Sequence, residues 1–181
     1  MSVQGFLAPE NFSMVEKGIY RSAFPRTKNL SFLERLGLKS VISLVPEEYP
    51  DILRTRYTSM GITIIETGID GNKWPFKQIN YPRFEEALST VLNEDNWPCL
   101  IHCNKGKHRT GCLVASLRLV RGWALSPTFA EYMLFSGARQ RLEDQVNPSF
   151  LPLSTPPLPL SLSPFRRNTS LTALLTLLGH L

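Results

Sequence analysis

Residues 98–121 read PCLIHCNKGKHRTGCLVASLRLVR, and this stretch decides the fold. Its first five residues form a short, largely apolar run that is typical of a buried strand. A loop rich in basic residues follows, and residues 111–121 then place leucines and a valine at helical spacing. The sequence therefore predicts a strand over 98–102, a tight loop, and a helix over 111–121.

The chain on either side of this stretch alternates between strand and helix patterns. β-Branched apolar runs predict strands, and apolar residues at helical spacing predict helices. The predicted strands cover residues 18–22, 39–45 and 61–67, and the predicted helices cover 29–36, part of 48–60, 79–93, and 126 to about 141. Ser126 and Pro127 are interpreted as the cap and first-turn pair of the last helix. We expect an α/β fold with a central, mostly parallel sheet that is flanked by helices.

The composition is that of one globular domain. The chain has 181 residues, of which 43% are hydrophobic and 19% are charged, so it is long enough to bury a core. A formal net charge of +5 indicates an anionic partner. Nucleic acid is disfavoured, because no Lys/Arg stripe interleaved with aromatic residues is present. We expect a phosphorylated small molecule or a phosphoprotein instead.

The cysteines and the N-terminus bear on the location of the protein. Cys99, Cys103 and Cys112 form an odd, clustered set, which is a poor disulfide framework and indicates a reducing compartment. The first residues lack the basic and apolar regions of a secretory signal. No stretch reaches the roughly 20 apolar residues of a membrane span. We therefore expect a protein of the cytoplasm, or also of the nucleus, without a membrane span.

The residues from Cys103 to Arg109 carry the chemistry. They lie between a strand end and a helix start, where ligands bind in parallel sheets. A tight loop at this place points successive backbone N–H groups inward, and the positive end of the helix dipole adds to them. Gly106 permits a close approach of the backbone, and Arg109 offers two parallel hydrogen bonds to phosphoryl oxygens. The loop is predicted to be a cradle for a phosphate group.

Cys103 is the predicted nucleophile in this cradle. The positive surroundings favour its thiolate, which can attack phosphorus and form a phosphocysteine that water later hydrolyses. This chemistry needs no metal and no other cofactor. Cys99 and Cys112 are interpreted as small buried hydrophobic residues, and no spaced Cys/His quartet supports a zinc site. A Walker loop is excluded, because residues 112 and 113 are not Lys and Ser/Thr.

The pattern His-Cys-x5-Arg-Thr-Gly at residues 102–111 resembles the signature of the protein-tyrosine phosphatase superfamily. The longer string HCNKGKHRTGCLVA is similar to the atypical dual-specificity phosphatases of plants and fungi, as are NFSMVEKGIYRSAFPR, LGLKSVISLVPEEYP and GIDGNKWPF elsewhere in the chain. The resemblance covers about residues 8–145. It implies the cysteine-dependent phosphatase fold and catalytic roles for Cys103 and Arg109. It also implies removal of the β-phosphate from inositol pyrophosphates, with weaker activity on phosphotyrosine.

The charge of the loop gives this substrate class support of its own. Lys105, Lys107 and His108, with Lys73 on the preceding loop, provide more positive charge than one phosphate group requires. Asn104, Gly106 and Thr110 complete the predicted substrate-binding set. The alternatives are a phosphoprotein substrate, an inositol lipid head group, lysines that only face solvent, or a phosphate-binding module without turnover.

A general acid is expected on a neighbouring loop. Asp70 precedes Cys103 by 33 positions, and dual-specificity members of the superfamily have an Asp at a similar offset. Asp70 is therefore the candidate, and a simple turn residue is the alternative, because Asp-Gly is common in turns. Thr110 is expected to orient the hydrolytic water or to form a hydrogen bond with the Cys103 sulfur. His102 is expected to brace the loop.

The phosphatase domain is predicted to cover residues 8–146, and residues 147–181 to form a proline-rich, disordered tail. The similar phosphatases continue from an Arg-x-x-Asp-Gln motif into a further helix. This chain has that motif at residues 141–145 but then reads VNPSFLPLSTPPLPLSLSP. We therefore expect an altered C-terminus that lacks one helix, with a loss of stability.

Overall fold

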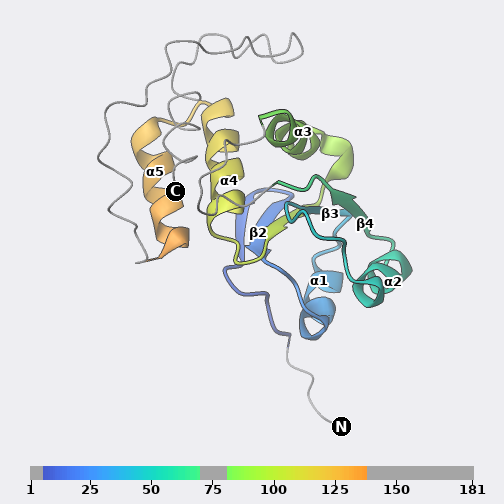
Figure 1. Cartoon of the computed structure of the whole chain (residues 1–181). Coiled ribbons are helices and arrows are strands. Elements are labelled where there is room, and N and C mark those ends of the chain that lie inside the picture. Colours follow the sequence, from blue (N-terminus) through green and yellow to red (C-terminus); the bar gives the residue numbers. More distant parts are fainter. Residues whose placement is uncertain (1–5, 70–80, 138–181) are drawn as a thin grey trace.

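Five strands form one sheet in the order β1-β2-β5-β3-β4 (Figure 1). This computed structural model describes residues 6–69 and 81–137. The strands are β1 (Ser13–Glu16), β2 (Ile19–Ala23), β3 (Ser40–Ser43), β4 (Thr63–Glu66) and β5 (Cys99–Cys103). β1 pairs antiparallel with β2, and the other three pairings are parallel, as expected for a mostly parallel sheet.

The helices lie on both faces of this sheet (Figure 1). One face carries α1 (Leu30–Arg35) and α2 (Asp51–Ser59), and the other carries α3 (Tyr81–Leu92) and α4 (His108–Val120). α5 (Leu125–Ser136) packs against α4, and two short 3-10 turns, η1 (Thr27–Asn29) and η2 (Glu94–Asn96), precede α1 and β5. The predicted α/β architecture is therefore confirmed.

The central strand β5 is buried throughout because both of its faces are covered. Leu100 belongs to the core formed with α1 and α2, whereas Ile101 and Cys103 belong to the core formed with α3 and α4. Successive side chains of a strand point to opposite faces, so each core receives alternate residues. β5 thereby places its last residue, Cys103, beneath the helical layer that contains α4.

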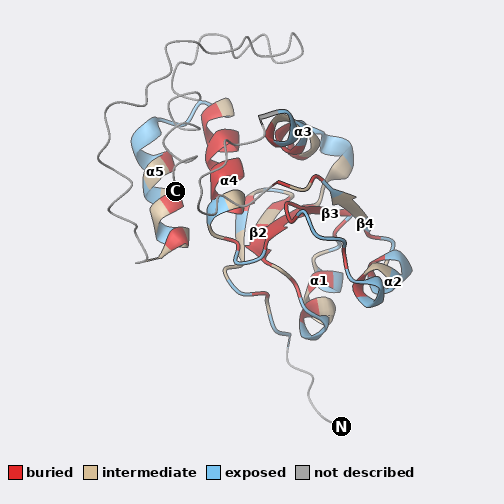
Figure 2. Cartoon of the chain, viewed as in Figure 1, coloured by how far each residue is buried: buried red, intermediate tan, exposed pale blue. Residues whose placement is uncertain are grey.

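α4 is buried on nearly all sides, as the red colour of this helix in Figure 2 shows. Every residue from Thr110 to Leu119 is buried between the sheet, α3 and α5. This explains why the sequence GCLVASLRL has almost no polar stripe. The helix that follows the Cys103 strand is thus held on several sides.

Two helix starts differ from the predicted ones. α4 begins at His108 and not at residue 111, so Arg109 lies in its first turn. α5 begins at Leu125 with Ala124 as N-cap, so the predicted cap at Ser126 is wrong. Pro127 is the third residue of α5, where a missing N–H is tolerated because the first four N–H groups of a helix have no internal acceptor.

β1 was not evident from the sequence, because residues 13–16 read SMVE and have no apolar pattern. β1 forms because Gly18, at φ +83°, turns the chain back so that Met14 faces Tyr20. None of the described helices is long and apolar enough to cross a membrane. α5 ends at Ser136 with Gly137 as its C-cap, at φ +71°, so the predicted end of the last helix near residue 141 is wrong. The predicted tail over 147–181 lies outside the described residues.

Candidate active site

Cys103 is the last residue of the central strand and is 4% exposed. Residues 103–109, here named the Cys103 loop, connect the carboxyl end of β5 to the first turn of α4. α4 has 13 residues, and its first N–H groups present a partial positive charge at this end of the sheet. The structure therefore puts Cys103 where the sequence analysis expected it.

Gly106 allows the loop to lie directly on β2. Its φ is +64°, and a Cβ atom at this position would lie 2.5 Å from both the carbonyl carbon and the carbonyl oxygen of Ser22. No side chain fits at that distance, so the contact of the loop with β2 requires glycine at position 106. The contact brings the loop against β2, the strand beside β5.

Two side chains from the N-terminal part of the chain hold the Gly106 carbonyl. Arg21 Nη2 donates to this oxygen at 2.8 Å, and Asn11 Nδ2 donates to it at 3.0 Å. In a trans peptide the carbonyl and the next N–H point in opposite directions. With its carbonyl fastened to Arg21 and Asn11, the Gly106–Lys107 peptide therefore directs the Lys107 N–H to the other side of the loop.

Arg109 is fixed by carbonyl groups beyond the ends of β3 and β4. Its Nη1 donates to Leu44 O and to Ile69 O, each at 3.1 Å. Nη1 carries two hydrogens, so both are used and the plane of the guanidinium is set. The rigid fork is thus oriented by two segments that are far from residue 109 in the sequence.

His102 lies immediately before the nucleophile and is fully buried. Its ring makes edge contacts with Phe24 and Tyr49, and its carbonyl accepts from Leu44 N at 2.9 Å. Burial lowers the pKa of His102 to about 3, so the ring is neutral at physiological pH. This packing agrees with the expected bracing role.

All three cysteines are free and buried. Burial raises the pKa of Cys99 and the pKa of Cys112 to about 12, so both thiols stay protonated. This agrees with their interpretation as small hydrophobic residues. Neither is placed to act as a thiolate.

The basic residues of the loop reach its outer side. Asn104, Lys105 and His108 are exposed and Lys107 is half-buried. His108 Nδ1 lies 3.1 Å from the Tyr132 hydroxyl of α5. The loop contains no acidic residue, so its outer side carries positive charge only.

One of the two roles expected for Thr110 is not observed in the structure. Its Oγ1 is buried and makes no hydrogen bond within the described part of the chain, so it does not bond the Cys103 sulfur here. The first turn of α4 begins at His108, which places Thr110 inside the helix and not on the loop. Asp70 and Lys73, the candidate acid and an additional basic residue, lie outside the described residues.

Sequence reasoning missed Asn11, Arg21 and Tyr132. A signal existed for Arg21, because a charged residue in the middle of a predicted buried strand needs a partner. Asn11 has a positive φ of 56°, which no sequence pattern indicated. Their partners are distant in sequence, and only the fold brings them to the loop.

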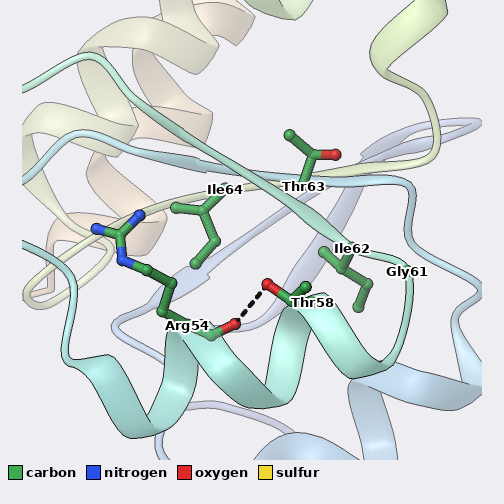
Figure 3. Close-up of a pocket in the computed structure, with 6 residues that line it drawn as sticks. All are labelled: Arg54, Thr58, Gly61, Ile62, Thr63 and Ile64. Carbon is green, nitrogen blue, oxygen red and sulfur yellow. Dashed lines mark hydrogen bonds between the residues drawn. The ribbon is translucent and has the colours of Figure 1, made fainter.

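Figure 3 shows a hollow of about 410 Å³ beside α2 and β4. Arg54 and Thr58 of α2 and Ile62 to Ile64 at β4 line it. β4 is an edge strand and is separated from β5 by β3. This hollow therefore takes no part in the surroundings of Cys103.

Comparison with known proteins gives three kinds of match. Residues 6–151 match the sequence model of the Tyrosine phosphatase family. Inositol diphosphatase DSP1 of Oryza sativa subsp. japonica is 47% identical over 142 residues, which cover 78% of this chain and 64% of the rice protein. Inositol diphosphatase SIW14 of Saccharomyces cerevisiae is 49% identical over 140 residues, which cover 77% of this chain and 50% of the yeast protein.

A solved structure is similar over the same region. The core catalytic domain of the PP-IP phosphatase SIW14 from S. cerevisiae, in complex with citrate, has 45% sequence identity and a TM-score of 0.71. The match covers 78% of this chain and 85% of that chain. This chain spans about half to two thirds of the length of the two curated relatives. With most of its length matched in sequence and in fold, the chain belongs to the Tyrosine phosphatase family.

Proposed function

We propose that the protein is a cysteine-dependent phosphatase that removes the β-phosphate from diphosphoinositol polyphosphates. The observation that carries this proposal is the Cys103 loop: a buried cysteine at the end of the central strand, a glycine pressed onto β2, and an anchored arginine at the start of α4. This arrangement concentrates backbone donors and positive charge around one thiol.

The reaction has two steps. The Cys103 thiolate attacks the β-phosphorus, a phosphorus–sulfur bond forms, and the bond to the bridging oxygen breaks. The inositol polyphosphate leaves with that oxygen. Water then attacks the phosphocysteine, the phosphorus–sulfur bond breaks, and inorganic phosphate and the thiolate are released. Arg109 and the loop N–H groups neutralise the oxygens of the transferring phosphoryl group in both steps.

The leaving group in this reaction is itself a phosphate, which is a stabilised anion. It needs less help from a general acid than the alkoxide or phenolate of a simple ester. Asp70 stays the predicted acid where one is used.

The substrate class is supported by charge and by the relatives. Lys105, Lys107, His108 and Arg109 gather on one short loop that lacks acidic residues. A densely phosphorylated substrate gains from such a positive surface. Relatives at 47% and 49% identity are inositol diphosphatases. The expected location in the cytoplasm or nucleus stays a prediction.

A phosphoprotein phosphatase is the runner-up, because the family model that matches residues 6–151 is that of tyrosine phosphatases. A phosphotyrosine ring gains from an apolar entrance, whereas a dense basic rim favours an inositol phosphate. Two further hypotheses are an inositol lipid as substrate and phosphate binding without turnover. One set of substrates separates all of them.

The test is phosphate release from a 5-diphosphoinositol polyphosphate, a phosphotyrosine peptide and an inositol lipid, measured for wild type and Cys103→Ser. We expect turnover of the diphosphate that is lost in Cys103→Ser, because serine lacks the nucleophilic thiolate. Preference for the peptide or the lipid would move the assignment to those substrates. A folded wild type that binds the diphosphate without turnover would favour the binding-module hypothesis.

A further inference from the structure

Arg21 is a charged residue in the interior of the protein. It lies in the middle of β2 and is 1% exposed. Burial lowers the pKa of Arg21 to about 10, with the nearby Glu131 and Cys103 acting in the opposite direction. The side chain is therefore still a cation at neutral pH, and it lies beneath the Cys103 loop.

The contacts of Arg21 point to the loop and to α5. Nη2 donates to the Gly106 carbonyl at 2.8 Å, and the guanidinium lies 3.9 Å from the centre of the Phe135 ring. Nε and Nη1 are buried and make no hydrogen bond within the described residues. Among the described residues, the Arg21 side chain thus makes one hydrogen bond, and its acceptor belongs to the backbone of the Cys103 loop.

Asn11 holds the same carbonyl from another direction. Its Nδ2 lies 3.0 Å from Gly106 O, 3.1 Å from Phe135 O and 3.4 Å from Lys105 O. Phe135 is therefore in contact with both Arg21 and Asn11. Together the two side chains tie the Cys103 loop to the last turn of α5.

We propose that Arg21 is a positioning residue for the phosphate cradle: it fixes the Gly106 carbonyl away from the ligand and so turns the Lys107 N–H toward it. Arg21 also supplies a permanent positive charge below the loop. This inference rests on the proposed function, because the cradle matters only where an anion binds. Arg21 acts through the backbone and need not touch the substrate.

Stability alone does not account for this residue. A buried guanidinium loses its hydration, and two of its nitrogens lack partners among the described residues. A methionine of similar length would fill the space without that cost, and the Gly106 carbonyl would keep its hydrogen bond from Asn11. A purely structural role and a positioning role therefore predict different results for Arg21→Met.

The experiment compares Arg21→Met and Arg21→Lys with the control Arg118→Met. Arg118 is also buried, donates to a backbone carbonyl (Val15 O) at 2.8 Å and stacks on the Trp123 ring at 4.1 Å. It lies ten residues beyond His108, which is about 15 Å along the axis of α4. Arg118 also forms an ion pair with Glu131, with its Nε 2.7 Å from Oε2, so the control removes more contacts than Arg21→Met but removes them far from the loop.

We expect Arg21→Met to lower kcat/KM for the diphosphate substrate about 100-fold, mainly through kcat. The reason is that a displaced Lys107 N–H no longer donates a hydrogen bond to the phosphoryl oxygens in the transition state. Arg21→Lys keeps the charge and one donor and should recover part of the loss. Arg118→Met should lower the melting temperature and leave kcat/KM unchanged. Wild-type kcat/KM in Arg21→Met, or a loss that only follows the fraction of unfolded protein, would overturn the proposal.

A second measurement makes the inference independent of turnover. The amide NMR signals of Gly106 and Lys107 are followed while orthovanadate is titrated into wild type and Arg21→Met. We expect altered signals and weaker vanadate binding in the variant. If wild type shows no turnover, the proposed function fails, but identical loop signals and vanadate affinity in both proteins are what would overturn the positioning role.

Discussion

Residue 106 has almost no room for a side chain, and the surrounding contacts explain why. A Cβ atom would meet the backbone of β2 at 2.5 Å, and φ is +64°. The strand that it would strike carries Arg21, whose side chain holds the carbonyl of the same glycine. Steric fit and hydrogen bonding therefore constrain the loop at one position.

We predict that Gly106→Ala abolishes most phosphate release and lowers the free energy of unfolding. An alanine in the left-handed backbone conformation alone costs about 1–2 kcal/mol, and we expect the loss to be larger than this. The added methyl group forces the loop off β2. Gly37→Ala is the control, since φ is +60° there and nothing lies within 4 Å of the added Cβ. Equal urea stabilities of the two variants, with activity kept in both, would show that the contact with β2 is unimportant.

His102 makes the stability depend on pH. The pKa of His102 is about 3 in the folded protein, against an ordinary 6.5. Between these values the unfolded chain binds a proton that the folded protein does not. The contribution of neutral His102 to the stability of the folded protein is therefore fully present above pH 6.5. It is lost as the pH falls toward 3.

We predict that the free energy of unfolding falls by up to about 1.4 kcal/mol per pH unit as the pH decreases below 6.5. His102→Phe keeps a ring between Phe24 and Tyr49 but cannot bind a proton, so its stability should fall less steeply. Urea unfolding between pH 7 and pH 5 tests this, above the range of most carboxylates. Parallel curves for wild type and variant would contradict it.

At the scale of elements, α5 is tied to the Cys103 loop by several contacts. Tyr132 approaches His108 at 3.1 Å, and the carbonyl of Phe135 accepts from Asn11. A Cβ atom on Gly111 of α4 would lie 2.8 Å from the Tyr132 ring, so the two helices pack closely there. The position of α5 therefore influences the loop. Gly137, the last described residue, lies beside the loop as well, since a Cβ atom on it would lie 3.3 Å from Lys107 Nζ.

For the whole molecule, two hydrophobic cores share one sheet. Leu33 belongs to the core under α1 and α2, and Leu113 belongs to the core under α4; both side chains are fully buried. β3 and β5 contribute side chains to both cores on alternate faces. Neither core can lose its packing without exposing the strands that support the other one.

We predict that Leu33→Ala and Leu113→Ala each lower the free energy of unfolding by about 2–5 kcal/mol. Because the cores share strands, each variant should unfold in a single transition. The check is whether tryptophan fluorescence and far-UV circular dichroism give the same urea midpoint. Two separate transitions in either variant would show that the layers unfold independently.

The sequence by itself determined the alternation of strands and helices and the position of the Cys103 loop. It could do so because periodicity, glycine and the spacing of Cys103 and Arg109 are local features of neighbouring residues. The resemblance of the loop then indicated the family. The short strand β1 and the first residue of α4 were beyond such patterns.

Only the tertiary structure decided how the loop is held. Arg21 is 85 positions from Gly106, and Arg109 is 65 positions from the Leu44 carbonyl that accepts from it. Such partners meet because β2 and β3 flank β5 in the sheet, although β5 comes after both in the chain. Hydrogen bonds between distant segments depend on strand order and register, and a pattern of neighbouring residues contains neither.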